Sequence, residues 1–132
     1  MDLEQRYKLS VVAREMDKVI NHSKNLTKNF NYIAESSITE TDFIEKALKE
    51  VNQKLFNILF HLKFSSEEYQ IISEIIETFD DVMKEKQDIY TYSVVAGGKE
   101  EKYTTNRKGH LIGILEWALD YIVGNIDVGV IE

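Results

Sequence analysis

Hydrophobic residues recur along the chain with the spacing of packed helices. The clearest run lies in the second quarter, where the intervals alternate between four and three residues: Ile44, Leu48, Val51, Leu55, Ile58 and Leu62. This a/d spacing places all six on one stripe of a helix, which a strand with its period of two cannot do. The pattern predicts a helix over residues 42–63 that packs lengthwise on a neighbour.

A looser version of the same spacing predicts a first helix over residues 2–34. Its stripe contains one polar residue, Ser23, and consists of Leu9, Val12, Met16, Val19, Ser23, Leu26, Phe30 and Ile33. From the rise per residue, this helix exceeds the second by about two turns. Either it breaks near the amide-rich residues 21–25, or its overhanging end packs against something else, such as another copy of the chain.

The third and fourth helices are predicted over residues 66–88 and 107–123. Their apolar stripes are Ile72, Ile75, Phe79 and Val82 in the third helix, and Leu111, Leu115, Ala118 and Ile122 in the fourth. Residues 36–41 form a predicted connector before the second helix. Polar residues of the types that cap helices flank the helices: Ser37 with Glu40 or Thr41 alone for the second, Ser65 with Glu68 for the third, and Asn106 as N-cap and Gly124 as stop for the fourth.

Residues 89–105 follow a different pattern and have two interpretations. The first stretch, Ile89–Val95, is rich in β-branched and aromatic residues, and Gly97-Gly98 separates it from Lys99–Thr105. This favours a β-hairpin with a diglycine turn. The alternative extends the third helix to Ala96 and uses Gly97 as its C-terminal cap.

Together these elements predict a mainly α-helical protein, an up-down four-helix bundle with a small β-hairpin or irregular arm between helices 3 and 4. Short polar turns make the first three helices antiparallel neighbours. The length of 132 residues fits a single domain over 1–132. The apolar tail over 126–131 could add a strand to the hairpin or pair with the edge of a partner, so a homodimer through this tail or through the overhang of the first helix is one expectation.

The amino-acid composition and the absence of known motifs exclude several kinds of site. The chain has no cysteine, which removes disulfides, thiolate metal sites and cysteine nucleophiles. No apolar stretch is long enough to span a bilayer, and no signal peptide precedes the first helix, so we expect no membrane association and a cytoplasmic location. No phosphate-binding loop and no motif of a serine nucleophile occurs in the sequence.

Acidic residues concentrate in one segment. The formal net charge is −7, which disfavours direct nucleic-acid binding. Residues 65–88 hold eight acidic and two basic residues, so this segment alone contributes 2 − 8 = −6. Four of the acids recur every seven residues and predict one ridge of the third helix, with Glu77 at its flank: Glu67, Glu74, Asp81 and Asp88. The ridge suits a partner with a basic surface, and it also suits a solvated helix face.

Tyrosines mark a second candidate contact region. Tyr90, Tyr92 and Tyr103 lie in the predicted arm with Lys99 and Lys102 nearby. Aromatic residues are enriched at protein interfaces. These tyrosines therefore either contact a partner or pack on the bundle.

Two groups of residues in the sequence suggest a metal site. His22, His61 and His110 fall on three helices, but their positions along an up-down bundle are too far apart for one ion. The carboxylates Glu74-x-x-Glu77 with Asp81, and Glu116-x-x-x-Asp120, resemble the paired motifs by which all-α nucleotide pyrophosphohydrolases hold magnesium. In the heptad frame both groups point away from the seam, and the second pair is spaced by four residues instead of three. We therefore expect no metal and no cofactor.

The resulting hypothesis is a small acidic protein-interaction module and not an enzyme. An inhibitor, antitoxin, immunity or regulatory protein fits this description. The size and residue bias are typical of accessory proteins of phages or mobile elements, including those directed at host defence. A magnesium-dependent nucleotide hydrolase and a structural homo-oligomer are the alternatives.

Overall fold

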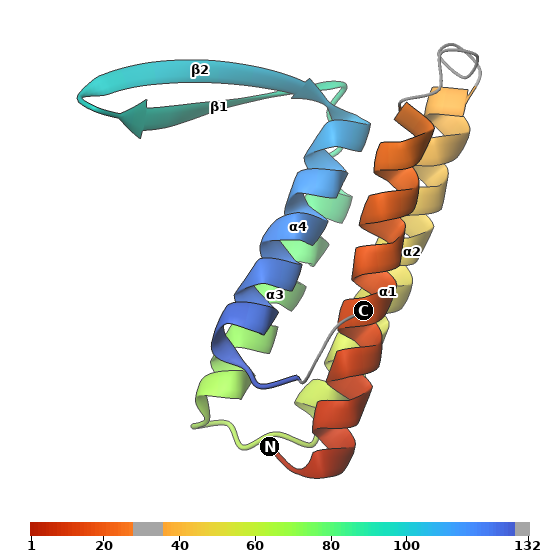
Figure 1. The fold of residues 1–132 in the computed structure, drawn as a ribbon, viewed down its shortest axis with the longest axis vertical. Helices are drawn as coiled ribbons and strands as arrows, with labels where there is room; N and C mark the ends of the chain where they lie inside the picture. The colour runs from red at the N-terminus through yellow and green to blue at the C-terminus, as the bar shows by residue number, and fades with distance from the viewer. Residues whose placement is uncertain (28–35, 129–132) are drawn as a thin grey trace.

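The computed structural model describes residues 1–27 and 36–128. Four antiparallel helices form a bundle, and a two-stranded hairpin lies between the third and fourth helices (Figure 1). This confirms the predicted mainly α-helical bundle with a small β arm. In chain order the elements are α1 (Leu3–Thr27), α2 (Ser36–Leu59), α3 (Glu67–Lys84), β1 (Ile89–Ala96), β2 (Lys99–Asn106) and α4 (Arg107–Asn125).

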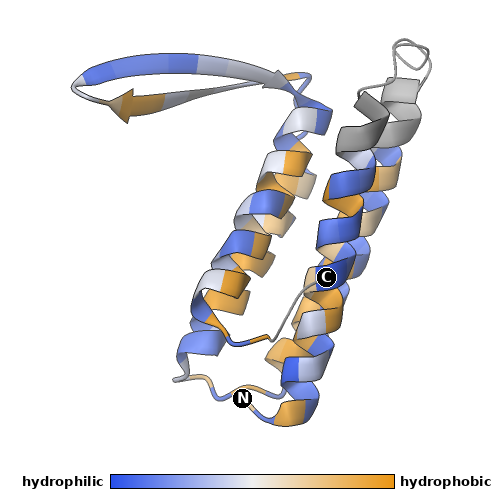
Figure 2. Cartoon of the chain, viewed as in Figure 1, coloured by the Kyte–Doolittle hydropathy of each residue, from blue (hydrophilic) through white to orange (hydrophobic). Residues whose placement is uncertain are grey.

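The predicted apolar stripes form the core. In α2 the first five seam residues are buried, and Leu62 packs at the edge. All four stripe residues of α3 and all four of α4 are buried as well. In α1 the buried residues include Leu9, Val12 and Met16, and the polar Ser23 is also buried, at 1% exposure. Hydrophobic residues accordingly follow the inward sides of the helices (Figure 2).

Several predicted helix ends are wrong by a few residues. Ser66, not Ser65, caps α3, because its hydroxyl accepts a hydrogen bond from the backbone N–H of Tyr69. Asn106 caps α4 as predicted, with its side chain accepting from the N–H of Gly109. Gly124 does not stop α4, which continues to Asn125. A glycine caps the end of a helix by adopting the left-handed conformation. Gly124 does not adopt it, because in the described chain the glycines with positive φ are Gly97 and Gly98.

The predicted connector over 36–41 is also wrong, because α2 already begins at Ser36. Neither proposed cap of α2, Ser37 with Glu40 or Thr41 alone, can act there, since these residues lie within the helix. Over the described residues α1 has 25 residues and α2 has 24. The predicted overhang of α1 involves residues 28–34, which lie outside the described residues. Helix α1 is continuous through residues 21–25 and has no break there. The seam positions Phe30 and Ile33 lie outside the described residues.

The hairpin confirms the diglycine turn and excludes an extended α3. β1 and β2 pair antiparallel from Ile89↔Asn106 to Ala96↔Lys99. Gly97 and Gly98 adopt φ of 59° and 77°, which glycine tolerates without steric cost. The hairpin projects sideways from the end of the bundle where α4 begins (Figure 1).

The predicted third strand is not formed by the described part of the tail. Ile126 and Val128 are instead buried against the chain's own core, at 6% and 8% exposure. A tail whose first apolar residues pack inside the monomer cannot offer them to a partner's strand. Residues 129–132, the rest of the predicted tail, lie outside the described residues.

Candidate functional site

The acidic residues of α3 lie on its solvent side because the core stripe occupies the opposite side. We call Glu67, Glu74 and Asp81 the acidic ridge; all three are exposed, as are the flanking Glu77, Asp80 and Glu85. Asp88 was predicted to extend this ridge, and that prediction is wrong. Helix α3 ends at Lys84, so Asp88 belongs to the connection that leads into β1.

No acidic residue between Glu67 and Asp88 forms an ion pair with any residue in the described part of the chain. Some acids elsewhere do form ion pairs, such as Glu15 with Lys54 at 2.6 Å and Glu45 with Arg107 at 3.0 Å. The negative charge of α3 is therefore not compensated locally. Such a face attracts cations and basic surfaces.

An aromatic pair on α4 borders the acidic ridge. The hydroxyl of Tyr121 donates a 2.7 Å hydrogen bond to Oε2 of Glu74. Its ring lies 5.6 Å from that of Trp117, which is 40% exposed. The hydrogen bond to Glu74 is the largest factor raising the pKa of Tyr121; burial and the charges of Glu74 and Glu67 act in the same direction.

The Trp117–Tyr121 pair was not predicted as part of this surface. The two residues are four positions apart, so a shared helix face was readable from the sequence. Their proximity to Glu74 was not readable, because it depends on how α3 and α4 are rotated about their axes. Glu74 now provides the link between the two helices on this face.

The tyrosines of the arm are in different surroundings. Tyr90 is buried and lies at the base of the hairpin. Its hydroxyl accepts from Nη1 of Arg107 at 2.6 Å and from the N–H of Gln87 at 2.9 Å, and donates to the carbonyl of Glu85 at 3.1 Å. The ring stacks on His110 with centroids 3.9 Å apart and planes 5° apart. Tyr90 therefore anchors the hairpin and is not available to a partner.

Tyr92 and Tyr103 lie opposite each other in the hairpin register. Tyr103 is 46% exposed and donates a hydrogen bond to Glu101, which raises its pKa. The structure thus divides the predicted contact residues between two regions. Glu67, Glu74, Glu77 and Asp81 lie on the bundle, while Tyr92 and Tyr103 lie on the projecting arm.

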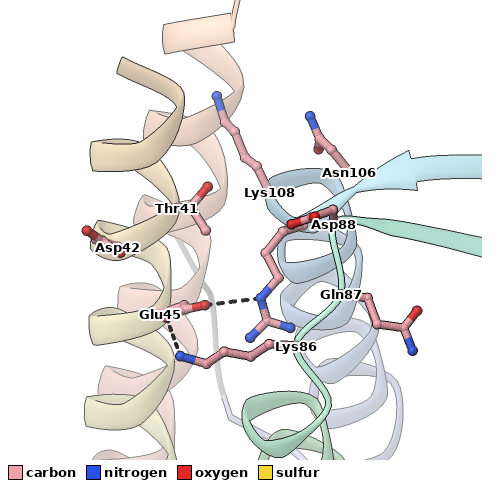
Figure 3. A pocket seen from close by; sticks show the side chains of 9 residues that line it. Thr41, Asp42, Glu45, Lys86, Gln87, Asp88, Asn106 and Lys108 are labelled. Carbon is pink, nitrogen blue, oxygen red and sulfur yellow. Dashed lines mark hydrogen bonds and ion pairs between the residues drawn. The ribbon is translucent and has the colours of Figure 1, made fainter. Parts of the chain in front are cut away.

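A polar cavity of about 370 Å³ lies where α2, α4 and the start of the hairpin meet (Figure 3). Arg107 lines it and donates from Nε to Glu45 at 3.0 Å and from Nη1 to the carbonyl of Val82 at 3.0 Å. Lys86 approaches the same Glu45 at 3.5 Å. The lining holds three acidic and three basic residues: Asp42, Glu45, Asp88, Lys86, Arg107 and Lys108. Arg107 and Glu45 serve to join α2, α3 and α4, so this cavity presents no single sign of charge to a ligand.

The groups considered for metal binding lie in separate places. In the described residues, no cluster of three or more His, Asp or Glu side chains could hold a metal ion. His110 stacks on Tyr90, while His22 lies edge-on to Phe43 at 5.4 Å. The α4 neighbour of Glu74 is the hydroxyl of Tyr121.

Comparisons of this chain with protein-family models, with curated proteins and with solved structures give no match. Among the helices of the described residues, none has the length and apolarity to cross a lipid bilayer.

Proposed function

We propose that this protein is a binding module that engages a basic surface of another protein through the acidic ridge and the Trp117–Tyr121 pair. The observation that carries the proposal is the exposed and locally unpaired charge of α3. A solvated helix needs polar residues for solubility, but it does not need one sign of charge in such excess.

The two parts of the surface supply different contributions to binding. The acidic ridge steers a positively charged partner and accelerates its association. Trp117 and Tyr121 supply apolar area, and their ring faces attract Arg and Lys side chains. Nucleic acid carries the same sign of charge as the ridge, so a basic protein is the favoured partner.

In the cell this activity corresponds to an inhibitor, an antitoxin, an immunity protein or a regulatory subunit acting in the cytoplasm. Masking a basic active or nucleic-acid-binding surface is the mechanism that an acidic helix face suits best. The residue bias supports an origin in a phage or mobile element, with a host defence protein as one target class.

The test reverses charge on the ridge and compares it with an equal change elsewhere. Glu74→Lys with Asp81→Lys changes the net charge by +4 and also removes the Tyr121 hydrogen bond. Glu4→Lys with Glu50→Lys makes the same change on α1 and α2, at the cost of one exposed Glu4–Lys8 pair at 3.5 Å, worth roughly 0.3–0.5 kcal/mol. Proteins captured by the wild type are identified and their affinities measured by calorimetry at several salt concentrations.

We expect the partner to bind the wild type and the α1/α2 variant alike, with affinity that falls as salt rises. The ridge variant should bind at least tenfold more weakly at low salt, about 1.4 kcal/mol. Equal affinity of both variants, with melting temperatures close to that of the wild type, would remove the acidic ridge from the binding surface.

A further inference from the structure

The hairpin extends away from the bundle with little of its surface covered. Apart from Tyr90, its β1 residues with described side chains are exposed, including Val94 at 48% and Val95 at 73%. In the described part of the chain the sheet has two strands, so the outer edge of β1 carries no neighbour. Isolated two-stranded hairpins are marginal in water, and a third or fourth strand gives independent stability.

The two edges of the hairpin differ in charge. β2 has the sequence KEEKYTTN, with four charged residues, whereas β1 has the sequence IYTYSVVA and none. Natural proteins protect free edges with charged residues, proline or bulges. β2 follows that rule and β1 does not; in Figure 2 the turn end of β1 is hydrophobic while β2 is largely hydrophilic. An eight-residue edge without protection is a template for another strand.

We propose that β1 pairs antiparallel with β1 of a second copy of this chain, which gives a four-stranded sheet in the order β2–β1–β1–β2. Two antiparallel copies of β1 match each other in sequence when the twofold axis that relates them passes through position 92. In that register Ile89 meets Val95 and Thr91 meets Ser93 of the second copy, while Tyr90, whose ring stays stacked on His110, lies opposite Val94 through its backbone alone. Apolar and hydroxyl cross-strand pairs of this kind are stabilising, and a twofold interface requires this self-complementarity.

The direction of the backbone N–H and C=O groups along β1 is compatible with this register. Ala96 and Lys99 flank a two-residue turn, so they form a hydrogen-bonded pair, and the bonded pairs then alternate along the hairpin. The N–H and C=O groups of Thr91, Ser93 and Val95 consequently point to the outer edge. These are the residues that the proposed register places opposite outward-pointing residues of the second copy.

The first experiment removes one outward N–H from each edge in turn. Ser93→Pro takes a donor from the outer edge of β1, while Thr104→Pro, the matched control, takes one from the outer edge of β2 without using the proposed interface. Proline cannot donate to a ladder. By light scattering after gel filtration, we expect the wild type and Thr104→Pro to have about twice the 15.4 kDa mass of one chain at high concentration, and Ser93→Pro to have the mass of one chain.

A second experiment tests the register and does not depend on proline being tolerated. The chain has no cysteine, so a single introduced cysteine can form a disulfide only between copies. Position 92 faces itself across the axis as a non-hydrogen-bonded pair, with Cα atoms about 4.5 Å apart, which is within disulfide range. Tyr92→Cys should give a covalent dimer under mild oxidation, and Thr104→Cys should not.

Three outcomes would overturn the proposal. One is a wild type with the mass of one chain at every concentration, and another is a dimer that Ser93→Pro leaves intact. If Ser93→Pro does not fold, as judged by its circular dichroism, the cysteine comparison decides alone. Equal crosslinking of Tyr92→Cys and Thr104→Cys would then overturn the proposal, and a strand from a different protein would be the remaining occupant of this edge.

Discussion

Gly109 lies in the first turn of α4, where the helix backbone passes close to the end of β2. A Cβ atom at this position would lie 2.1 Å from Oγ1 of Thr105, whereas a Cβ at Gly113, one turn further on, meets nothing within 4 Å. Gly109 also donates its N–H to the capping side chain of Asn106 at 2.8 Å. An alanine at 109 therefore requires the Thr105 side chain to move, whereas an alanine at 113 requires no rearrangement.

We expect Gly109→Ala to lower the free energy of unfolding by ~1–3 kcal/mol through overpacking. Gly113→Ala should raise it by up to ~1 kcal/mol, since alanine is the better helix former. Urea denaturation measures both values. Adding Thr105→Ala to Gly109→Ala removes the clashing oxygen and should recover part of the loss. Equal stabilisation by the two glycine substitutions would show that the clash is relieved without cost.

At the scale of elements, the helices were predictable because burial repeats along each of them. The seam from Ile44 to Ile58 is a periodic property of the sequence, and all five positions are buried. Helix ends depend on single residues and were less predictable. Ser65 and Ser66 are both capping types, and the hydrogen bond to Tyr69 selects the second. The start of α2 was placed too late because serine and threonine favour caps in general, yet helices also accept them.

The attachment of the hairpin to the bundle should depend on pH. His110 stacks on Tyr90 beside Arg107, and burial, followed by the charge of Arg107, lowers the pKa of His110 below 6.5. In this case the unfolded chain binds the proton more readily than the folded one. Stability is therefore complete above the unfolded pKa of about 6.5 and falls as pH decreases through that value.

His110→Phe keeps an aromatic ring for stacking and removes the titration. We expect the free energy of unfolding of the wild type to drop more than that of His110→Phe between pH ~7.5 and ~5.5. Denaturation in urea at the two pH values gives the difference, and His61→Phe, at an exposed position, is the control. An identical pH dependence of the wild type and His110→Phe would place the titrating group elsewhere.

At the scale of the whole molecule, the composition of the candidate surface was only half predictable. The heptad spacing of Glu67, Glu74 and Asp81 put them on one ridge, because the repeat belongs to a single helix. The Tyr121–Glu74 bond joins residues 47 positions apart, and the Arg107–Glu45 bond joins residues 62 positions apart. Such contacts depend on helix rotation and order, which a hydrophobic stripe does not specify.

The nucleotide-hydrolase alternative makes a claim about the whole molecule, since its magnesium must hold α3 and α4 together through Glu74, Glu77 and the acids of α4. A thermal melt with and without magnesium or manganese tests it. A ligand at 100 times its dissociation constant adds about 2.7 kcal/mol to stability, which raises Tm by several degrees in a domain of this size.

Because the α4 contact of Glu74 is the neutral hydroxyl of Tyr121 and not a carboxylate, we expect Tm to stay unchanged. Glu77→Ala is the matched variant, because it removes a required ligand from an exposed position without touching the core. A rise in Tm that Glu77→Ala abolishes would mean that the carboxylates converge on a cation, and hydrolysis of nucleotides would replace partner binding as the leading hypothesis. A rise that Glu77→Ala leaves intact would instead indicate general screening of the excess negative charge of α3, which needs no metal site.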